Sequence, residues 1–349
     1  MTSKIMLWGC GGAGISAVDE AGAQIDSLGD GFCSVKYHYI DTSRANIDKI
    51  TPKGEFHQIV SMANSGDGID GSGSERKTHA NDIVDSVKKC LDNNKYFERV
   101  KGEYHVVCAS ASGASGSISS NQIVKHLIMR DIPVVAVVIG DSSNLLYTKN
   151  TINTLASLDA VAKQTGKAIT VIYINNHSMM NANNGIAKAE KEVNKYIGNI
   201  LTTLSLFLSN EHENIDNEDM YNILVPSNYK QIKVQPGLYG LMFFSKEIKP
   251  IENAIPVIGR SLTLSNKDVD LSISLLHHKF GVITSTNAIG IVKEDNIPLH
   301  MISFANYFVA EQKNLVERKK NYENIAANIT NEALVGCEDG EIDESGLIL

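Results

Sequence analysis

Short apolar runs recur along the first half of the chain, and each is followed by small or polar residues and then by a stretch with helical spacing. The runs are rich in Val, Ile and Tyr, and they lie at Lys4–Trp8, Tyr37–Ile40, Tyr104–Cys108, Val134–Ile139 and Ala168–Ile174. Such runs are typical of buried strands. Because strands that alternate with helices form parallel sheets covered on both faces, the pattern predicts an α/β fold with a Rossmann-like parallel sheet.

The pattern changes near residue 184. Residues 184–212 carry apolar positions at helical spacing, which predicts one long central helix. Later apolar runs predict the strands of a smaller α+β C-terminal domain, at Gly240–Phe244, Leu271–Leu276, Gly281–Thr286 and Leu299–Ile302. A last helix is predicted near Tyr307 to Leu334.

These elements divide the chain into parts with different roles. We expect an α/β domain over residues 1–183, the central helix over 184–212, the α+β domain over 213–305, a C-terminal helix over 306–334 and a tail over 335–349. The tail contains Glu338, Asp339, Glu341, Asp343 and Glu344. An acidic run of this kind is typical of a solvated tail.

Composition narrows the class of protein. The 349 residues carry a formal net charge of −8, so we expect no direct nucleic-acid partner. The five cysteines show no metal-type spacing and indicate reduced thiols, and the histidine spacings fit no ligand set, so no metal site is predicted. No apolar run approaches the roughly 20 residues of a membrane span. We therefore expect a cytoplasmic protein without a membrane partner.

Two turns rich in glycine and serine follow apolar runs and open predicted helices, Gly9–Gly14 and Ser112–Ser117. A helix N-terminus offers unpaired backbone N–H groups and a partial positive charge, which favour an anion. Glycine and serine allow the backbone to approach phosphate oxygens. Both turns fall at the carboxyl ends of predicted strands, where ligands of such sheets bind. The two turns therefore predict a nucleotide site.

These two turns alone do not determine which class of nucleotide binds. Gly9-x-Gly11-x-x-Gly14, with Asp41 at the end of the second predicted strand, matches the dinucleotide fingerprint of a Rossmann-type NAD(P)-dependent oxidoreductase. The same turn can also serve only to close a strand onto a helix. The second turn favours a triphosphate, since a dinucleotide fold needs no further phosphate cradle. Residues Asn64–Ser74 suit either a solvent loop or a wall near the terminal phosphate.

The order of these parts resembles the tubulin/FtsZ superfamily. Three segments resemble its first three phosphate loops: GCGGAGISA (Gly9–Ala17), DTSRAN (Asp41–Asn46) and GSGSERK (Gly71–Lys77). SGASGSI (Ser112–Ile118) lies where the family carries its glycine-rich signature, with Ala114, Ser115 and Ile118 in place of a glycine, the threonine and the last glycine. The resemblance implies that residues 1–183 form a GTPase domain that binds GTP or GDP with Mg²⁺.

The resemblance also implies a set of nucleotide contacts. In the phosphate loops they are Gly11, Gly12, Ala13, Ser16, Asp41, Gly71, Ser72, Gly73, Ser112, Gly113, Ala114, Ser115, Gly116 and Ser117. Further contacts are implied for Asn150, Asn176 and Asn194. Asn176 and Asn194 resemble the family's two base contacts, where an amide can both donate to and accept from the guanine edge. Surface asparagines are the alternative for both positions.

The segment Asn214-Ile215-Asp216-Asn217-Glu218-Asp219 resembles the family's NxDxxD catalytic loop. The resemblance implies catalytic roles for Asn214, Asp216 and Asp219 at the γ-phosphate of the neighbouring subunit in a head-to-tail filament. There the carboxylates would position a water, while Mg²⁺ and backbone donors neutralise the phosphates. A solvated acidic turn is the alternative for the loop. A nucleotide-binding scaffold without hydrolysis is the alternative for the protein, and the presence of both aspartates disfavours it.

The chain length, the degenerate signature and the acidic tail most resemble phage and plasmid tubulins of the PhuZ/TubZ type. In the phage branch the acidic tail binds the next subunit of the filament. The resemblance implies that residues 338–344 bind a neighbouring subunit in the same way. The resemblance implies a filament in the host bacterial cytoplasm that positions phage DNA or a phage compartment. A plasmid-segregation tubulin is the alternative. Because the sequence offers no DNA-binding motif, we expect cargo to be held through other proteins.

Overall fold

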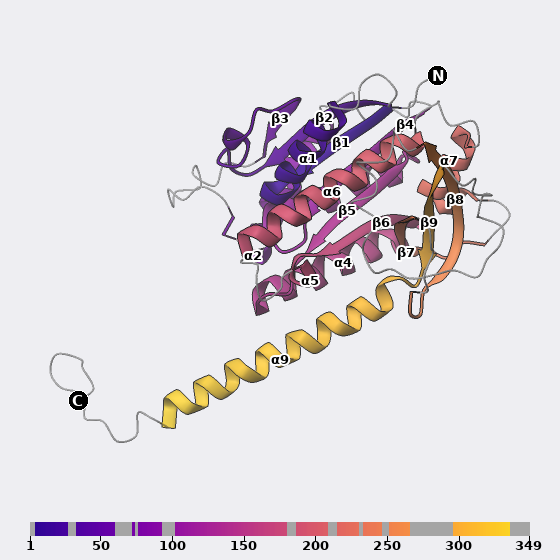
Figure 1. Ribbon diagram of the computed structural model, residues 1–349. Coiled ribbons are helices and arrows are strands. Elements are labelled where there is room, and N and C mark those ends of the chain that lie inside the picture. Colours follow the sequence, from indigo (N-terminus) through magenta and orange to yellow (C-terminus); the bar gives the residue numbers. More distant parts are fainter. Residues whose placement is uncertain are drawn as a thin grey trace.

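The computed structural model describes residues 4–26, 33–59, 72–73, 76–92, 102–179, 186–208, 215–229, 233–245, 251–265 and 296–335. Within these ranges, one sheet of nine strands runs through the molecule in the order β3-β2-β1-β4-β5-β6-β7-β9-β8 (Figure 1). Its strands are β1 Lys4–Cys10, β2 Ser34–Asp41, β3 Glu55–Gln58, β4 Glu103–Ser110, β5 Val134–Gly140, β6 Ala168–Asn175, β7 Gly237–Ser245, β8 Ile255–Ser265 and β9 Asn296–Ala305.

Neighbouring strands from β3 to β7 are parallel, and the β7–β9 and β8–β9 pairs are antiparallel. Every residue of β5 is buried, as its run of Val and Ile predicts for a strand covered on both faces. The predicted α/β fold with a mostly parallel sheet is confirmed. Strands β7 and β9 contain the predicted runs Gly240–Phe244 and Leu299–Ile302. The strands predicted at Leu271–Leu276 and Gly281–Thr286 lie outside the described residues.

Helices cover both faces of the sheet. They are α1 Gly11–Asp26, α2 Arg76–Asp92, α3 Ala114–Met129, α4 Leu145–Thr165, α5 Asn176–Met179, α6 Ile186–Leu208, α7 Asn217–Leu224 and α9 Phe308–Val335, with short 3₁₀ turns at Ile47–Lys49 and Pro226–Asn228. Residues of α1, α6 and α7 join one buried apolar cluster, and residues of α2, α3, α4 and the start of α9 join another. The result is a three-layer molecule from which the rest of α9 projects (Figure 1).

Helix α6 is the predicted central helix. Val193, Ile197, Leu201, Leu204 and Leu208 are each no more than 2% exposed, and this spacing places them on one helical face. That face packs into the apolar cluster shared with α1. Among the described residues, no helix has the length and hydropathy of a membrane-spanning segment. The predicted tail beyond Val335 lies outside the described residues.

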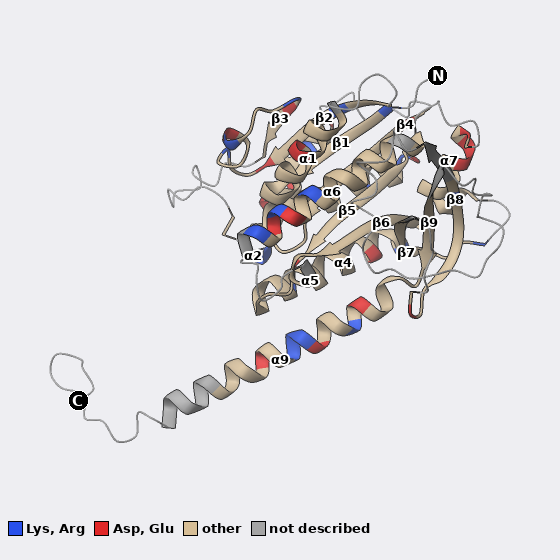
Figure 2. Cartoon of the chain, viewed as in Figure 1, with Lys and Arg blue, Asp and Glu red and all other residues tan. Residues whose placement is uncertain are grey.

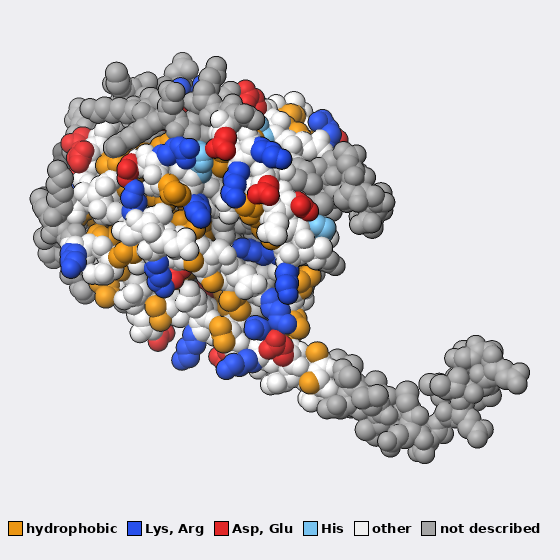
Figure 3. All heavy atoms as spheres, turned by 180° about the vertical axis from the view of Figure 1, so that it is seen from behind, with side chains coloured by type: hydrophobic (Ala, Val, Ile, Leu, Met, Phe, Trp, Pro, Cys, Tyr) orange, Lys and Arg blue, Asp and Glu red, His pale blue; other side chains and the backbone are white. Residues whose placement is uncertain are grey.

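Charge is distributed unevenly over the elements. The first turn of α7 carries Glu218 and Asp219, and the middle of α9 carries Arg318, Lys319 and Lys320 (Figure 2). Seen from behind, lysine and arginine side chains are spread over the body, among fewer acidic ones (Figure 3). The acidic start of α7 and the basic part of α9 therefore lie on different parts of the surface.

Candidate nucleotide-binding site

A cavity of about 260 Å³ lies at the carboxyl ends of β1, β2 and β4. Its described lining is polar and consists of Gly11, Gly12, Asp41, Thr42, Ser43, Asn46, Ser72, Gly73, Ser110, Gly113, Ala114, Ser115 and Gly116. Both glycine-rich turns, the loop after β2 and the start of the predicted third loop thus meet at one cavity. A cavity of this volume suits the phosphate part of a nucleotide, since whole ligand pockets usually measure about 300–1,000 Å³.

Gly11 and Gly116 bring the two turns into backbone contact. Gly11 has φ +67°, and a Cβ there would lie 2.8 Å from the Cα of Gly116. A Cβ on Gly116 would lie 2.6 Å from the carbonyl oxygen of Cys10. Real Cβ atoms do not approach other atoms this closely, so any side chain would push the turns apart. Glycine is therefore required at both positions for the shape of the cavity.

Two helices begin at this cavity. Helix α1 starts at Gly11, and α3 starts at Ala114, with Gly113 in an extended conformation as its N-cap. A Cβ on Gly113 would meet nothing within 4 Å, so this residue faces open space. The partial positive charges of the two N-termini add at the cavity and favour an anionic ligand.

Three hydroxyl groups join loops that are distant in the sequence. The Ser115 Oγ lies 2.7 Å from the Thr42 Oγ1 and 3.1 Å from the Ser72 Oγ. Ser115 stands in place of the threonine of the glycine-rich signature that this turn resembles, and it keeps the hydroxyl. The cluster fixes the start of α3 against the loop after β2 and against the start of the third loop.

Asp41 is the only carboxylate among the described residues that line the cavity. Its oxygens accept hydrogen bonds from the Thr42 backbone N–H at 2.7 Å and from the Asn46 Nδ2 at 3.0 Å. Burial raises the pKa of Asp41, while these hydrogen bonds oppose the shift. The side chain is thus held in place at the end of β2 with its charge partly shielded from water.

Some predicted contacts support the cavity from behind. The Asn150 Nδ2 donates to the Ser112 carbonyl at 2.7 Å, and the Ser117 hydroxyl donates to the Gly113 carbonyl at 2.5 Å. Both interactions hold the second turn from its buried side. Ala13 and Ser16 lie on α1, beyond the residues that line the cavity.

Asn176 begins α5 and Asn194 lies within α6, and neither lines this cavity. Their contact with a base stays a prediction. Gly71 and Asn214 lie outside the described residues. Thr42, Ser43 and Asn46 belong to the segment that resembles a phosphate loop but were not predicted as individual contacts, and neither was Ser110, the last residue of β4. Position at a strand's carboxyl end was the signal that could have identified them.

The acidic loop forms the start of α7. Asp216 is exposed and caps the helix, because its Oδ1 accepts from the Asp219 backbone N–H at 2.8 Å. The Asp219 carboxylate forms an ion pair with Arg260 of β8. This hydrogen-bonded partner raises the pKa of Arg260 above its usual value. Asp219 is therefore fixed in direction, while Asp216 faces solvent.

The acidic loop and the cavity lie at opposite ends of the sheet. The Tyr104 hydroxyl donates to the Asn217 carbonyl at 3.3 Å, which places α7 beside the start of β4. Ser110, at the other end of β4, lines the cavity. A strand rises by about 3.3 Å per residue, so the two positions are separated by about 20 Å. Figure 1 shows the same separation, with α6 running between the two ends.

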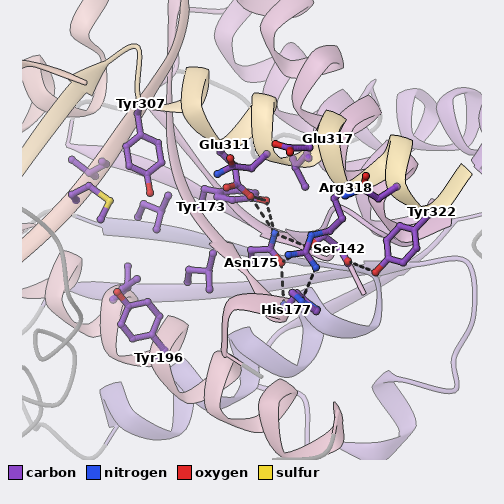
Figure 4. A pocket seen from close by; sticks show the side chains of 18 of the residues that line it. Ser142, Tyr173, Asn175, His177, Tyr196, Tyr307, Glu311, Glu317, Arg318 and Tyr322 are labelled. Carbon is purple, nitrogen blue, oxygen red and sulfur yellow. Dashed lines mark hydrogen bonds between the residues drawn. The ribbon is translucent and has the colours of Figure 1, made fainter. Parts of the chain in front are cut away.

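A second cavity, of about 710 Å³, lies between α9 and the carboxyl end of β6 (Figure 4). Glu311 of α9 accepts hydrogen bonds from the Tyr173 hydroxyl at 2.8 Å and from the Asn175 Nδ2 at 3.1 Å. Arg318 donates to the Nε2 of His177 at 2.7 Å. The pKa of His177 is lowered, mainly by burial and in addition by the positive charge of Arg318. The first half of α9 is thus fixed to the residues on either side of Asn176.

The Tyr322 hydroxyl donates to the carbonyls of Ser142 and Ser143, at 3.1 and 2.9 Å. These two residues lie between β5 and α4. Together with the contacts of Glu311 and Arg318, this links α9 to the ends of two parallel strands. We call these contacts of Glu311, Arg318 and Tyr322 the α9 clamp.

The fold, the two phosphate turns that meet at the strand ends and the acidic loop at the far end of the central helix are similar to those of the tubulin/FtsZ superfamily. No family model matches the chain. A curated relative, the phage tubulin-like protein of Pseudomonas phage phiKZ, is 24% identical over 99% of this chain and 98% of its own length. The predicted resemblance to this superfamily, in its phage form, is confirmed.

Solved structures agree with this assignment of the fold. A phage tubulin PhuZ structure with GDP has a TM-score of 0.65 at 18% identity, covering 99% of this chain and 98% of that one. A protofilament of TubZ from bacteriophage PhiKZ has a TM-score of 0.66 at 21% identity, covering all of both chains. The chain is therefore a tubulin-like protein in fold.

Proposed function

We propose that this chain is a GTPase that assembles head to tail into filaments and hydrolyses GTP where two subunits meet. The observation that carries the proposal is the separation between the cavity lined by Gly11 and Gly116 and the acidic start of α7. At about 20 Å along the sheet, Asp216 cannot reach a phosphate in the cavity of its own chain. A second chain stacked end to end would bring one chain's α7 to the other's cavity.

The cavity would hold the phosphates of the nucleotide. The turns at Gly11–Gly12 and Gly113–Gly116 would donate backbone N–H groups to the phosphate oxygens, and the two helix N-termini would add a favourable potential. Gly113 leaves space for close approach, and Ser115 and Thr42 present hydroxyls at the same wall. The related PhuZ structure with GDP supports a guanine nucleotide as the ligand. Asn176 and Asn194 are proposed to read the base.

Mg²⁺, when bound, would neutralise phosphate charge during hydrolysis. Asp41 is the described carboxylate in the cavity wall and is the residue proposed to hold the ion. Its hydrogen bonds to the Thr42 backbone and to Asn46 set its direction. An oxygen ligand of this kind suits Mg²⁺, which is bound through carboxylates together with substrate phosphates.

The start of α7 would act on the cavity of the neighbouring subunit. Asp216 is exposed, so it can enter an interface and orient a water toward the γ-phosphate. Asp219 is held by Arg260, which fixes the direction of its carboxylate. Asn214 is proposed as a third member of the loop. Since the two groups come from different chains, hydrolysis would begin only after assembly.

The tail is proposed to strengthen the same assembly. Residues 338–344 would bind a basic surface of the next subunit along the filament. In an infected bacterium the filament would act in the cytoplasm and position phage DNA or a phage compartment. The filament structures of PhuZ and TubZ relatives support self-association as the mode of action. A heterologous contact that does not close yields a filament rather than a ring.

The test is GTP turnover per chain, measured over a range of protein concentrations. We expect negligible turnover below a threshold concentration, a sharp rise above it, and sedimentation of the protein at the same threshold with GTP but not with NADH. Constant turnover per chain at all concentrations would refute the proposal. Binding of NADH in a fluorescence titration would favour the oxidoreductase alternative instead.

A matched pair of variants tests the role of α7. Asp216→Asn removes the negative charge but keeps a residue that caps helices well. We expect it to bind GTP and assemble while hydrolysing GTP at least about 100-fold more slowly, the scale expected for a group that acts in the transition state. Glu218→Gln changes a neighbouring exposed carboxylate and should hydrolyse GTP at the wild-type rate. Equal turnover by Asp216→Asn and the wild type would remove α7 from the mechanism.

A further inference from the structure

Two histidines and a glutamate meet on the edge of the sheet farthest from β8. His38 lies on β2, and Glu55 and His57 lie on the edge strand β3. His38 is the register partner of Glu55, and His57 is two residues further along the same strand. Since residues two apart share a face of a strand, the three side chains lie on one face of the sheet.

The ligand atoms of these side chains converge. The His38 Nδ1 lies 3.4 Å from the His57 Nε2, and the Glu55 Oε2 lies 3.8 Å from the same His57 nitrogen. One nitrogen or oxygen from each of the three residues lies within 4.8 Å of the others. Zinc binds imidazole nitrogen at about 2.0–2.1 Å, so two nitrogens this far apart would subtend roughly 110° at one ion, the tetrahedral angle.

We propose that His38, Glu55 and His57 form a binding site for a transition-metal dication, Zn²⁺ in the first place. Two imidazoles and one carboxylate are a known zinc ligand set that leaves a fourth position for water. Imidazole ligands select transition metals over Mg²⁺, which prefers oxygen. The site is separate from the cavity that holds the phosphate turns.

The surroundings of the site orient its ligands. The ring of Trp8 stacks on His38 with centroids 4.4 Å apart, which fixes the imidazole plane. The His57 and Glu55 side chains are 15% and 56% exposed, which leaves a route for the ion from solvent.

A direct hydrogen bond between the two imidazoles is the competing interpretation. At 3.4 Å between nitrogens, such a bond would be longer than the usual 2.7–3.2 Å. The ring centroids are 5.7 Å apart with an angle of 19° between planes, so a small turn of each ring would direct both nitrogens to a common ion. The two interpretations differ in whether added metal binds.

A bound ion would fasten β3 to β2 near the nucleotide cavity. Strand β3 has four residues and, among the described strands, pairs only with β2, so the backbone hydrogen bonds of its ladder are few. Asp41 of the cavity wall follows His38 by three residues, and its carbonyl accepts from the Ile59 N–H, just beyond β3, at 2.9 Å. The metal site would therefore stabilise the strand pair that carries Asp41, whether or not the chain hydrolyses GTP.

The experiment uses the full chain, stripped with EDTA and then titrated with Zn²⁺ or Co²⁺. We expect one strongly bound ion per chain, a rise in Tm with Zn²⁺ but not with Mg²⁺, and the visible absorption of tetrahedral Co²⁺. His57→Gln and Glu55→Gln should each weaken binding by at least about tenfold, the lower end of the cost of losing even a supporting group. The control, His126→Gln, changes a half-buried histidine on α3 and should bind as the wild type does.

Three results would overturn the proposal. One is the absence of stoichiometric Zn²⁺ binding by the wild type. Another is unchanged affinity in both His57→Gln and Glu55→Gln, since these partly exposed positions can be substituted without loss of the fold. The third is a near-ultraviolet charge-transfer band with Co²⁺, which would show that cysteine thiolates hold the ion instead.

Discussion

At the scale of single residues, Gly113 and Gly116 show how the same residue type serves two purposes in one turn. Gly116 is packed against the backbone of Cys10, whereas Gly113 faces open space at the start of α3. The sequence motif treats the two glycines alike. Only the packing distinguishes the one that the fold requires from the one that the ligand would require.

The two glycines provide a matched pair of substitutions. Gly116→Ala places a methyl group 2.6 Å from a carbonyl oxygen. We expect it to lower the free energy of unfolding by about 1–3 kcal/mol, the usual cost of overpacking, and to abolish measurable GTP binding. Gly113→Ala should keep wild-type stability and lose affinity only for the nucleotide. Urea unfolding and a titration with fluorescent GTP measure the two effects. Equal stability of the two variants would contradict the assigned packing.

His105 is a buried residue whose contribution to the stability of the fold should depend on pH. It lies on β4, the Trp8 Nε1 donates to its Nδ1 at 3.2 Å, and burial lowers its pKa from 6.5 to about 3. The unfolded chain binds a proton below about pH 6.5 while the folded chain does not. The contribution of neutral His105 to the free energy of unfolding is therefore complete above about pH 6.5 and is lost as the pH falls toward 3.

We expect His105→Gln to flatten this pH dependence, because glutamine can accept the same hydrogen bond without titrating. Between about pH 7 and pH 4, the wild type should lose up to about 3 kcal/mol more unfolding free energy than the variant. Urea unfolding with EDTA present measures this without bound metal. Parallel pH profiles for the two proteins would show that His105 does not titrate in this way.

At the scale of elements, the α9 clamp connects the C-terminal helix to the carboxyl ends of β5 and β6. Glu311 binds Tyr173 and Asn175, and Arg318 binds His177. Two of these partners, Asn175 and His177, are the residues on either side of Asn176. If Asn176 reads the base, the position of α9 and the position of the base loop are linked. A displacement of α9 by a neighbouring subunit would then also move the loop that contacts the base.

Removing Glu311 tests the clamp. Glu311→Ala leaves the buried Tyr173 hydroxyl without its acceptor, which should cost about 1–3 kcal/mol. We expect faster hydrogen exchange along α9, since its attachment is local and can open without global unfolding. Glu317→Ala, on an exposed position of the same helix, is the control and should exchange as the wild type does. Identical exchange in both variants would mean that other contacts hold the helix.

At the scale of the whole molecule, the sequence pattern was sufficient for the parallel strands β1, β2, β4, β5 and β6 and for the long helices. Residues such as Val134–Ile139 are buried on both faces, so their apolar run is continuous and unambiguous. Strand β3 was not predicted, because EFHQ at a sheet edge has little apolar character. Strand β8 was missed because Pro256 and Gly259 interrupt its pattern, and it pairs irregularly there.

The sequence predicted those parts of the candidate site that have a local sequence motif. The turns at Gly11 and Gly116 carry local signatures, so the residues around them could be named in advance. Side chains that meet only through tertiary packing, such as Thr42 with Ser115 or His38 with His57, have no signature in sequence. The docking of α9 beside Asn175 likewise depends on the whole fold.

We propose that each chain carries one half of each of two active centres. Mixing Gly116→Ala, which lacks the nucleotide half, with Asp216→Asn, which lacks the catalytic half, tests it most directly. Each variant alone should show no GTP turnover above background, while an equimolar mixture should recover up to about a quarter of the wild-type rate, because random head-to-tail pairing joins the two intact halves at that fraction of contacts. A mixture that stays inactive while both variants sediment together with GTP would contradict the claim, as would full turnover by Asp216→Asn alone.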